Sequence, residues 1–334
     1  MGQDLRGTSP TAMNEEQVLQ KIASGTKPGR LAAAGVHLGI GDDAALFRPH
    51  AGQQLILTCD WSVEGTHFLR DKHPPDAVGW KSLARAVSDV AAMGGTPRCC
   101  LLSLALPATH TGRWLTEFLG GLHRASRAFH CALAGGDTTR REQILINITV
   151  VGEIAPGQAL QRTGARAGDF IFVSGKLGEA DRGWERLQNV RGGVKKNDRL
   201  LRKHLFPEPR LTLGAWLARN RLATAAMDIS DGLSIDLMRL CKASRVGARV
   251  EVASLPMLRD VAKPKAVQLA LHGGDDYELL FTVTPRKVRQ IPRVFRGLPL
   301  WQIGKILRKG KIELHAEGGS VHRLKPGGWD PFRK

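Results

Sequence analysis

Short runs of glycine and aspartate recur along this chain, each after an apolar segment, and they limit the folds that are open to it. They lie at 39–43, 135–137, 228–232 and 273–276. Any one of them is best explained as a turn or a helix N-cap, because Asp and Gly favour both. Four such runs at distant positions, in a chain with 49 Lys and Arg but only 31 Asp and Glu, indicate a shared role.

The segments between these runs alternate in hydrophobic period. The first half predicts strands at 54–59, 98–106, 131–134 and 144–154, and helices at 75–93 and 111–130. After a break at 155–157, the second half predicts strands at 169–174, 248–252, 277–283 and 300–306. It also predicts helices at 177–190 and 231–244, a polar connection at 191–210 and a turn at 227–230. We therefore expect a tail (1–13), an N-terminal α/β domain (14–154) and a C-terminal α+β domain (155–334).

Composition excludes several classes of protein. No stretch approaches the roughly 18 apolar residues of a membrane span, and the first ten residues lack a signal-peptide core, so we expect a cytoplasmic protein. Five cysteines without CxxC spacing favour buried free thiols over disulfides or zinc. The net charge of +18 attracts polyanions, but aromatic residues make up only 5% of the chain and no recognition helix is evident, so we do not expect nucleic acid as a partner.

Carboxylates gathered in one place repel one another unless a cation neutralises them. Mg²⁺ is the cation that fits, since it takes carboxylate oxygens and keeps room for phosphates, whereas zinc and iron sites use His or Cys. The chain has no GxxxxGK[ST] loop, no kinase HRD or DFG set, no GxSxG elbow and no HExxH. We therefore expect Mg²⁺-dependent phosphoryl transfer from ATP on a different architecture.

Six motifs occur in a fixed order: GIGDDA at 39–44, Asp60 with VEGTHF at 63–68, SDVAAMG at 88–94, GGDTT at 135–139, MDISDGL at 227–233 and GGDDYEL at 273–279. Together they resemble the thiamine-monophosphate kinase family, of the superfamily of aminoimidazole ribonucleotide synthetase and selenophosphate synthetase. The resemblance implies the two-domain fold of that superfamily and a homodimer formed through the sheet of the N-terminal domain. It also implies that ATP and thiamine monophosphate are the substrates.

The resemblance also implies roles for individual residues. Several Mg²⁺ ions would be held by Asp43, Asp60, Asp89, Asp137, Asp228 and Asp231, with Thr58 assisting. ATP would contact Gly136, Asp137, Arg162 and Ser230, and thiamine monophosphate would contact His67, Asp275 and Trp329. Two positions depart from the family pattern. Cys59 replaces a hydroxyl residue, so only its backbone is a credible metal ligand, and Asp275 replaces the usual Glu.

The proposed acceptor is itself a phosphate, which is largely a dianion at neutral pH, so no general base is expected. Direct in-line attack follows, without a phospho-enzyme. Asp42 and Asp276 are assigned to turn structure. The rival functions are a sister activity of the superfamily, for which selenide chemistry would want a cysteine before Cys59, and a basic nucleic-acid-binding protein without catalysis.

Overall fold

The structure is a computed structural model, and it describes residues 13–189, 198–308 and 310–332. The chain divides into two compact units. The first comprises Met1–Arg48, Cys59–Leu83 and Arg98–Val150, and the second comprises Pro49–Thr58, Ala84–Pro97 and Val151–Lys334. Within the described residues, no helix has the length and apolar character needed to cross a membrane.

The described part of the chain begins with two short helices and a two-stranded sheet, which the sequence patterns did not predict. They are α1 (Glu15–Ser24), α2 (Pro28–Ala33), β1 (Val36–Leu38) and β2 (Leu46–Phe47), with β1 antiparallel to β2. Asn14 begins α1 with a capping box, in which its side chain accepts from the Gln17 amide and the Gln17 side chain accepts from the Asn14 amide. Of the predicted tail, residues 1–12 lie outside the described residues.

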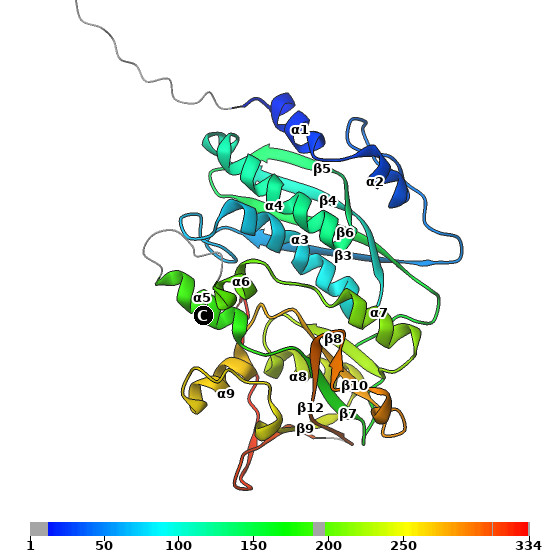
Figure 1. The fold of residues 1–334 in the computed structure, drawn as a ribbon, viewed down its shortest axis with the longest axis vertical. Coiled ribbons are helices and arrows are strands. Elements are labelled where there is room, and N and C mark those ends of the chain that lie inside the picture. The colour runs from blue at the N-terminus through cyan, green and yellow to red at the C-terminus, as the bar shows by residue number, and fades with distance from the viewer. Residues whose placement is uncertain (1–12, 190–197, 309, 333–334) are drawn as a thin grey trace, which may run out of the picture. The chain divides into compact units, whose positions relative to one another are not determined.

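A four-stranded sheet in the order β3-β6-β4-β5 follows. Its strands are β3 (Gln54–Val63), β4 (Thr96–Leu106), β5 (Ala132–Arg140) and β6 (Leu145–Ile154). The helices of this part are α3 (Pro75–Ala92), the 3-10 turn η1 (Ala108–His110) and α4 (Arg113–Phe129), which runs along β5 (Figure 1). Glycines bring α3 and α4 close together, because a Cβ at Gly121 would lie 1.8 Å from the Asp76 carbonyl oxygen.

The second unit contains an eight-stranded sheet in the order β14-β13-β9-β12-β7-β10-β8, with β11 paired to β12. The pairs are antiparallel except β13 with β9. Its strands are β7 (Phe170–Ser174), β8 (Ala225–Ile229), β9 (Gly247–Glu251), β10 (Glu278–Val283), β11 (Val294–Phe295), β12 (Leu298–Leu307), β13 (Ile312–His315) and β14 (Val321–Arg323).

The helices that follow β6 among the described residues are α5 (Glu179–Gln188), α6 (Arg199–Leu205), α7 (Leu211–Arg219), α8 (Leu233–Ser244) and α9 (Lys263–His272), with 3-10 turns η2 (Val252–Ser254) and η3 (Val288–Gln290). The apolar side of α8 packs into the core with the buried strands: Leu237 and Leu240 are fully buried in one cluster with Ile229 and Leu280. This packing fixes the loop between β8 and α8 at the end of a buried strand.

The mixed α/β character and most predicted elements are confirmed, with corrections at the glycine runs. Residues 135–137 are not a turn, since they lie inside β5 and pair in parallel with β4, and 227–229 belong to β8 rather than to a turn. Asp60 lies within β3, not after it. The polar connection predicted at 191–210 contains α6, and its first part, through 197, lies outside the described residues.

The cysteines are free, as expected, but they are not all buried. Cys99, Cys100, Cys131 and Cys241 are buried, and burial raises the pKa of Cys241 to about 12. Cys59 is exposed on β3. The expectation of buried thiols was therefore wrong for Cys59, because this side of the strand is not covered.

Candidate active site

Helix α3 carries Asp89 to a position beside Thr58 of strand β3. The Thr58 hydroxyl donates a hydrogen bond to Asp89 Oδ2 at 2.5 Å. Burial raises the pKa of Asp89, although the Thr58 hydrogen bond and the charges of Arg162 and Arg85 act in the opposite direction. Two predicted metal ligands are therefore adjacent, and Arg162, predicted to contact the nucleotide, acts on the charge of Asp89.

Strand β8 brings Asp228 to the same helix. Asp228 is almost fully buried near the end of this strand, and the buried Ser88 hydroxyl donates to its Oδ2 at 2.8 Å. Because Ser88 directly precedes Asp89, Asp228 lies beside the turn of α3 that carries Asp89. Three predicted ligands of the second unit, Thr58, Asp89 and Asp228, therefore lie close together. The Thr58 hydroxyl binds Asp89, and the Ser88 hydroxyl binds Asp228.

The loop between β8 and α8 connects to the other predicted residues of this unit through its backbone. The Asp275 amide donates to the Ser230 carbonyl oxygen at 2.7 Å, and the Trp329 amide donates to the Asp231 carbonyl oxygen at 3.0 Å. Gly328 allows this approach, since a Cβ there would lie 2.1 Å from the Asp231 carbonyl oxygen. Residues predicted for metal, nucleotide and thiamine phosphate therefore share one hydrogen-bonded loop cluster.

Sequence reasoning missed the two residues that hold this loop, Asp236 and Arg239 of α8. Asp236 is fully buried and accepts hydrogen bonds from the Ser230, Asp231 and Gly232 amides. Burial and the charge of Asp231 raise the pKa of Asp236 to about 6, opposed by Arg239 and the loop amides. An acidic residue in the first turn of a helix, on its apolar side, was the signal available in the sequence.

Asp275 has a distinct environment. It adopts a left-handed conformation with φ of +66°, as does Tyr277 with φ of +50°. The Tyr277 hydroxyl donates to Asp275 Oδ1 at 2.8 Å, and Arg85 NH1 lies 3.7 Å from the same oxygen. His204 Nδ1 lies 3.9 Å from Oδ2. Tyr277 is the one tyrosine of the chain, and neither it nor Arg85 was singled out from the sequence.

The adjacent carboxylate, Asp276, belongs to the structure of the fold. Its two oxygens accept hydrogen bonds from the Gly178 and Ala180 amides at 2.6 Å and 3.1 Å, at the beginning of α5. A carboxylate in that place satisfies amides that have no partner within the helix. Asp276 was assigned to turn structure from the sequence, whereas here it binds the beginning of a helix 96 to 98 positions away.

The remaining predicted residues lie in the first unit. Asp43 and Asp137 are exposed, and the Asp60 carbonyl oxygen accepts from the Asn147 side chain at 3.3 Å. His67 Nδ1 accepts from the Val63 amide at 3.1 Å, which leaves Nε2 as the protonated nitrogen of a neutral ring. Gly136 has a positive φ, and a Cβ there would lie 1.8 Å from the Leu102 carbonyl oxygen. Close strand packing therefore requires glycine at 136.

The donor chemistry of the predicted metal ligands fits Mg²⁺. Carboxylates and a hydroxyl supply oxygen only, which Mg²⁺ prefers, and the partly buried Asp89 has a pKa that a nearby cation would lower. Residues 13–189, 198–308 and 310–332 contain no group of three or more His, Cys, Asp or Glu side chains arranged to hold a metal. The roles of these residues as ligands therefore remain predictions.

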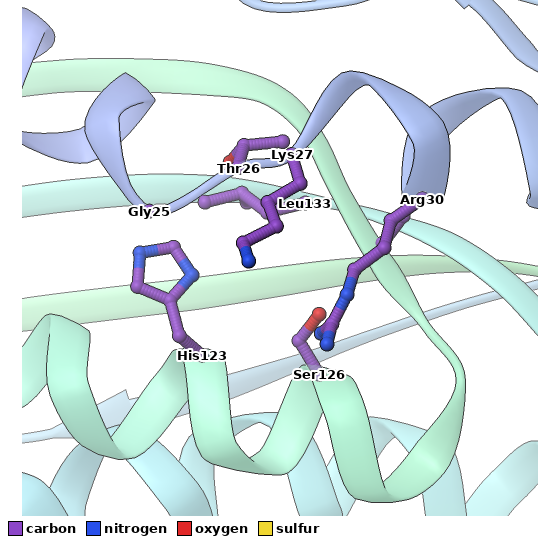
Figure 2. Close-up of a pocket in the computed structure, with 8 residues that line it drawn as sticks. Gly25, Thr26, Lys27, Arg30, His123, Ser126 and Leu133 are labelled. Carbon is purple, nitrogen blue, oxygen red and sulfur yellow. The ribbon is translucent and has the colours of Figure 1, made fainter.

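A small hollow in the first unit is lined by none of these residues. Figure 2 shows Lys27, Arg30, His123 and Ser126 directed toward one another between the α1–α2 connection and α4. The space is about 10 Å³, which is room for about one water. Burial and two neighbouring arginines lower the pKa of His123. A nucleotide does not fit here, so we do not count the hollow as a substrate site.

Comparison with known proteins identifies the class. The family described as AIR synthase related protein matches twice, its N-terminal domain at 41–154 and its C-terminal domain at 166–317. The chain is therefore a two-domain protein of the AIR synthase-related class, and the expected fold class is confirmed.

Relatives and solved structures narrow this further. The thiamine-monophosphate kinase of Synechococcus elongatus is 35% identical over 286 residues, covering 82% of this chain and 85% of the relative. The crystal structure of the thiamine-monophosphate kinase of Stenotrophomonas maltophilia has a TM-score of 0.79 at 36% identity, covering 92% of this chain and 98% of that one. AaThiL complexed with AMPPCP and TMP has a TM-score of 0.73 at 33% identity, covering 85% and 89%. This chain belongs to the thiamine-monophosphate kinase family.

Proposed function

We propose that this protein transfers the γ-phosphoryl group of ATP to thiamine monophosphate, giving ADP and thiamine diphosphate. The observation that carries the proposal is the match over most of both chains to proteins named for this activity, one of them in a complex with AMPPCP and TMP. The loop cluster supports it, because Asp231, Asp275 and Trp329, predicted for metal and acceptor, are joined through backbone hydrogen bonds.

The proposal assigns each predicted residue a task. Asp43, Asp60, Asp89, Asp137, Asp228 and Asp231 would hold Mg²⁺, with Thr58 and the backbone of Cys59 assisting. Bound Mg²⁺ would neutralise phosphate charge. Gly136, Asp137, Arg162 and Ser230 would contact ATP. Thiamine monophosphate would contact His67, Asp275 and Trp329.

The chain's own task in this reaction is to position two anions. His67, held through Nδ1 by the Val63 amide, would present an Nε2–H donor to a phosphate oxygen. Trp329 is 46% exposed, so its ring can stack on the cationic rings of thiamine. Since the acceptor phosphate is already ionised, positioning and charge neutralisation are sufficient for direct in-line transfer.

The activity assay uses purified protein with ATP, Mg²⁺ and thiamine monophosphate, followed for thiamine diphosphate. We expect product with the natural sequence. In Asp228→Asn the rate should fall by at least about 100-fold, on the order seen when a group that stabilises the transition-state charge is removed. Asp71→Asn makes the same chemical change outside the predicted site, at an exposed position, and serves as the control. Absence of thiamine diphosphate with the natural sequence contradicts the proposed function.

The direct route has a separate test. Rapid-quench experiments with γ-labelled ATP and no acceptor should leave the protein unlabelled, because no residue is asked to carry the phosphoryl group. A trapped aspartyl-phosphate that forms and decays fast enough for turnover would replace in-line transfer with a two-step route.

We further propose a homodimer formed through the N-terminal sheet. Strand β3 is an edge strand in the order β3-β6-β4-β5. Leu55, Leu57 and Trp61 alternate along it and are 46%, 69% and 52% exposed. An exposed apolar row on an edge strand favours pairing with a second copy.

Light scattering tests this proposal. Leu57→Asp should shift the natural dimer toward monomer, whereas Val294→Asp, which alters a valine that is 55% exposed in the second unit, should not. A natural protein that is monomeric at micromolar concentration would contradict the dimer.

A further inference from the structure

The buried carboxylate of Asp236 organises the loop that follows β8. Its Oδ2 accepts from the Ser230, Asp231 and Gly232 amides at 3.1, 3.1 and 3.2 Å. Three successive amides directed at one oxygen fix the path of the backbone, since each would otherwise lack a partner next to the helix N-terminus. The side chain is fully buried in the second unit.

Arg239, less than one turn further along α8, connects this carboxylate to Asp231. Its Nη1 lies 2.8 Å from Asp236 Oδ1 and 2.5 Å from Asp231 Oδ2. A charge-assisted contact of this kind restricts the rotation of the Asp231 side chain. Because the contact uses Oδ2, the second oxygen of Asp231 can face a metal while the carboxylate stays fixed.

We propose that Asp236 and Arg239 are positioning residues for the phosphoryl-transfer site: Asp236 sets the backbone of Ser230–Gly232, and Arg239 sets the carboxylate of Asp231. This inference rests on the proposed function, in which Asp231 is a metal ligand. Residues that hydrogen-bond metal ligands orient them, and their loss commonly costs about 10- to 100-fold in metal affinity or activity.

The two residues have separable effects. The hydrogen bonds of Arg239 go to the carboxylates of Asp231 and Asp236, so its loss should act on metal binding. Asp236 also holds the backbone to which the Asp275 and Trp329 amides are hydrogen-bonded. Loss of Asp236 should therefore weaken the binding of both the metal and thiamine monophosphate. A purely structural role predicts lower thermal stability without either change.

The first experiment compares Arg239→Gln with Arg249→Gln. The control is matched, because Arg249 is also partly exposed in the second unit and pairs with a carboxylate, Glu251, at 2.9 Å. The unfolding temperature is measured against Mg²⁺ concentration in the presence of AMPPCP, which needs no turnover. Arg239→Gln should require about 10- to 100-fold more Mg²⁺ for half of the shift, and the control should match the natural protein.

Kinetics then separate the two residues. Arg239→Gln should raise the Mg²⁺ concentration for half-maximal rate with KM for thiamine monophosphate unchanged. Asp236→Asn should raise both, and its amides at 230–232 should exchange hydrogen faster even without metal. Arg239→Lys, which keeps the charge but not the planar group, should fall between Arg239→Gln and the natural protein.

Two results would overturn the inference. One is an Arg239→Gln protein that is less stable but needs no more Mg²⁺ than the natural protein, and the other is an Asp236→Asn protein with natural metal and substrate dependence. Failure of the proposed function would look different. The natural protein would then make no thiamine diphosphate, while the Mg²⁺-dependent unfolding shift and the exchange of the loop amides would still report on positioning.

Discussion

Arg210→Met should strongly destabilise the second unit, because it would remove the bidentate partner of a buried carboxylate. Arg210 Nε donates to Glu278 Oε2 at 2.7 Å, and its NH2 donates to Oε1. The two side chains are 12% and 1% exposed. Burial alone would raise the pKa of Glu278, but the charge and hydrogen bonds of Arg210 hold it below its ordinary value. The pair is therefore ionised in the folded state.

The magnitude follows from what remains after the substitution. Removing one partner of a buried ion pair costs about 3–5 kcal/mol. Glu278 would keep the Ser174 hydroxyl at 2.5 Å and Lys203 at 3.7 Å, so we expect the lower end, about 3 kcal/mol. With a urea m-value of about 3 kcal/mol/M, the unfolding midpoint should fall by about 1 M.

The assay is urea unfolding at pH 7 followed by fluorescence, with Arg113→Gln as control. Arg113 pairs with Glu117 but its side chain is 91% exposed, so its midpoint should not move. The double variant Arg210→Met, Glu278→Leu should recover most of the loss, since no buried charge is left unpaired. A midpoint for Arg210→Met equal to that of Arg113→Gln would refute the reasoning.

The destabilisation caused by Arg210→Met should depend on pH. A carboxyl group whose pKa is lowered by folding contributes stability above its unfolded pKa, near 4.5, and loses it as pH falls through the folded pKa. The difference in unfolding free energy between the natural protein and Arg210→Met should therefore shrink as the pH is lowered toward 4. A difference that grows in acid would contradict the assignment of Glu278 as the ionised partner.

Three further predictions concern other parts of the chain. Gly214→Ala should destabilise the protein although alanine favours helices, because the new Cβ would lie 1.9 Å from the Ala91 carbonyl oxygen. The expected result is a lower temperature of thermal unfolding. Folding lowers the pKa of His123, chiefly through burial, so the folded state binds fewer protons and stability should fall as pH drops below about 6.5; His123→Gln should remove part of that fall in urea titrations. Tyr277→Phe should raise KM for thiamine monophosphate, with kcat less affected, because Asp275 loses its hydroxyl donor.

The sequence predicted those parts of the fold in which one chain segment carries its own signal. The hydrophobic period predicted a helix at 75–93, and the structure has α3 at Pro75–Ala92. The glycine runs were predicted less well. Gly135 and Gly136 favour a turn by composition, yet they lie in β5, because they pair in parallel with residues of β4. At these glycines the pairing with β4 outweighs the local preference for a turn. That pairing joins two distant segments, so it cannot be predicted from either segment alone.

The same difference explains which residues of the candidate site were found. Asp89 and Asp228 stood out because each belongs to a motif of contiguous residues. Ser88, whose hydroxyl donates to Asp228, reaches its partner across the fold, because the two residues are 140 positions apart. No spacing rule connects such positions, so they could be identified only from the structure.

The segment 273–279 shows why a motif cannot be assigned a single role. Its three acids sit within four positions, and the backbone sends them in different directions: Asp276 to the start of α5, Glu278 to Arg210, and Asp275 to Tyr277. An extended strand would place Asp276 and Glu278 on the same face, but Asp275 and Tyr277 have positive φ angles, so the segment is not extended there. Substituting Asp276 or Glu278 should therefore reduce stability. Tyr277, which holds Asp275, can be changed while the contact of Asp276 with α5 and the ion pair of Glu278 with Arg210 stay intact.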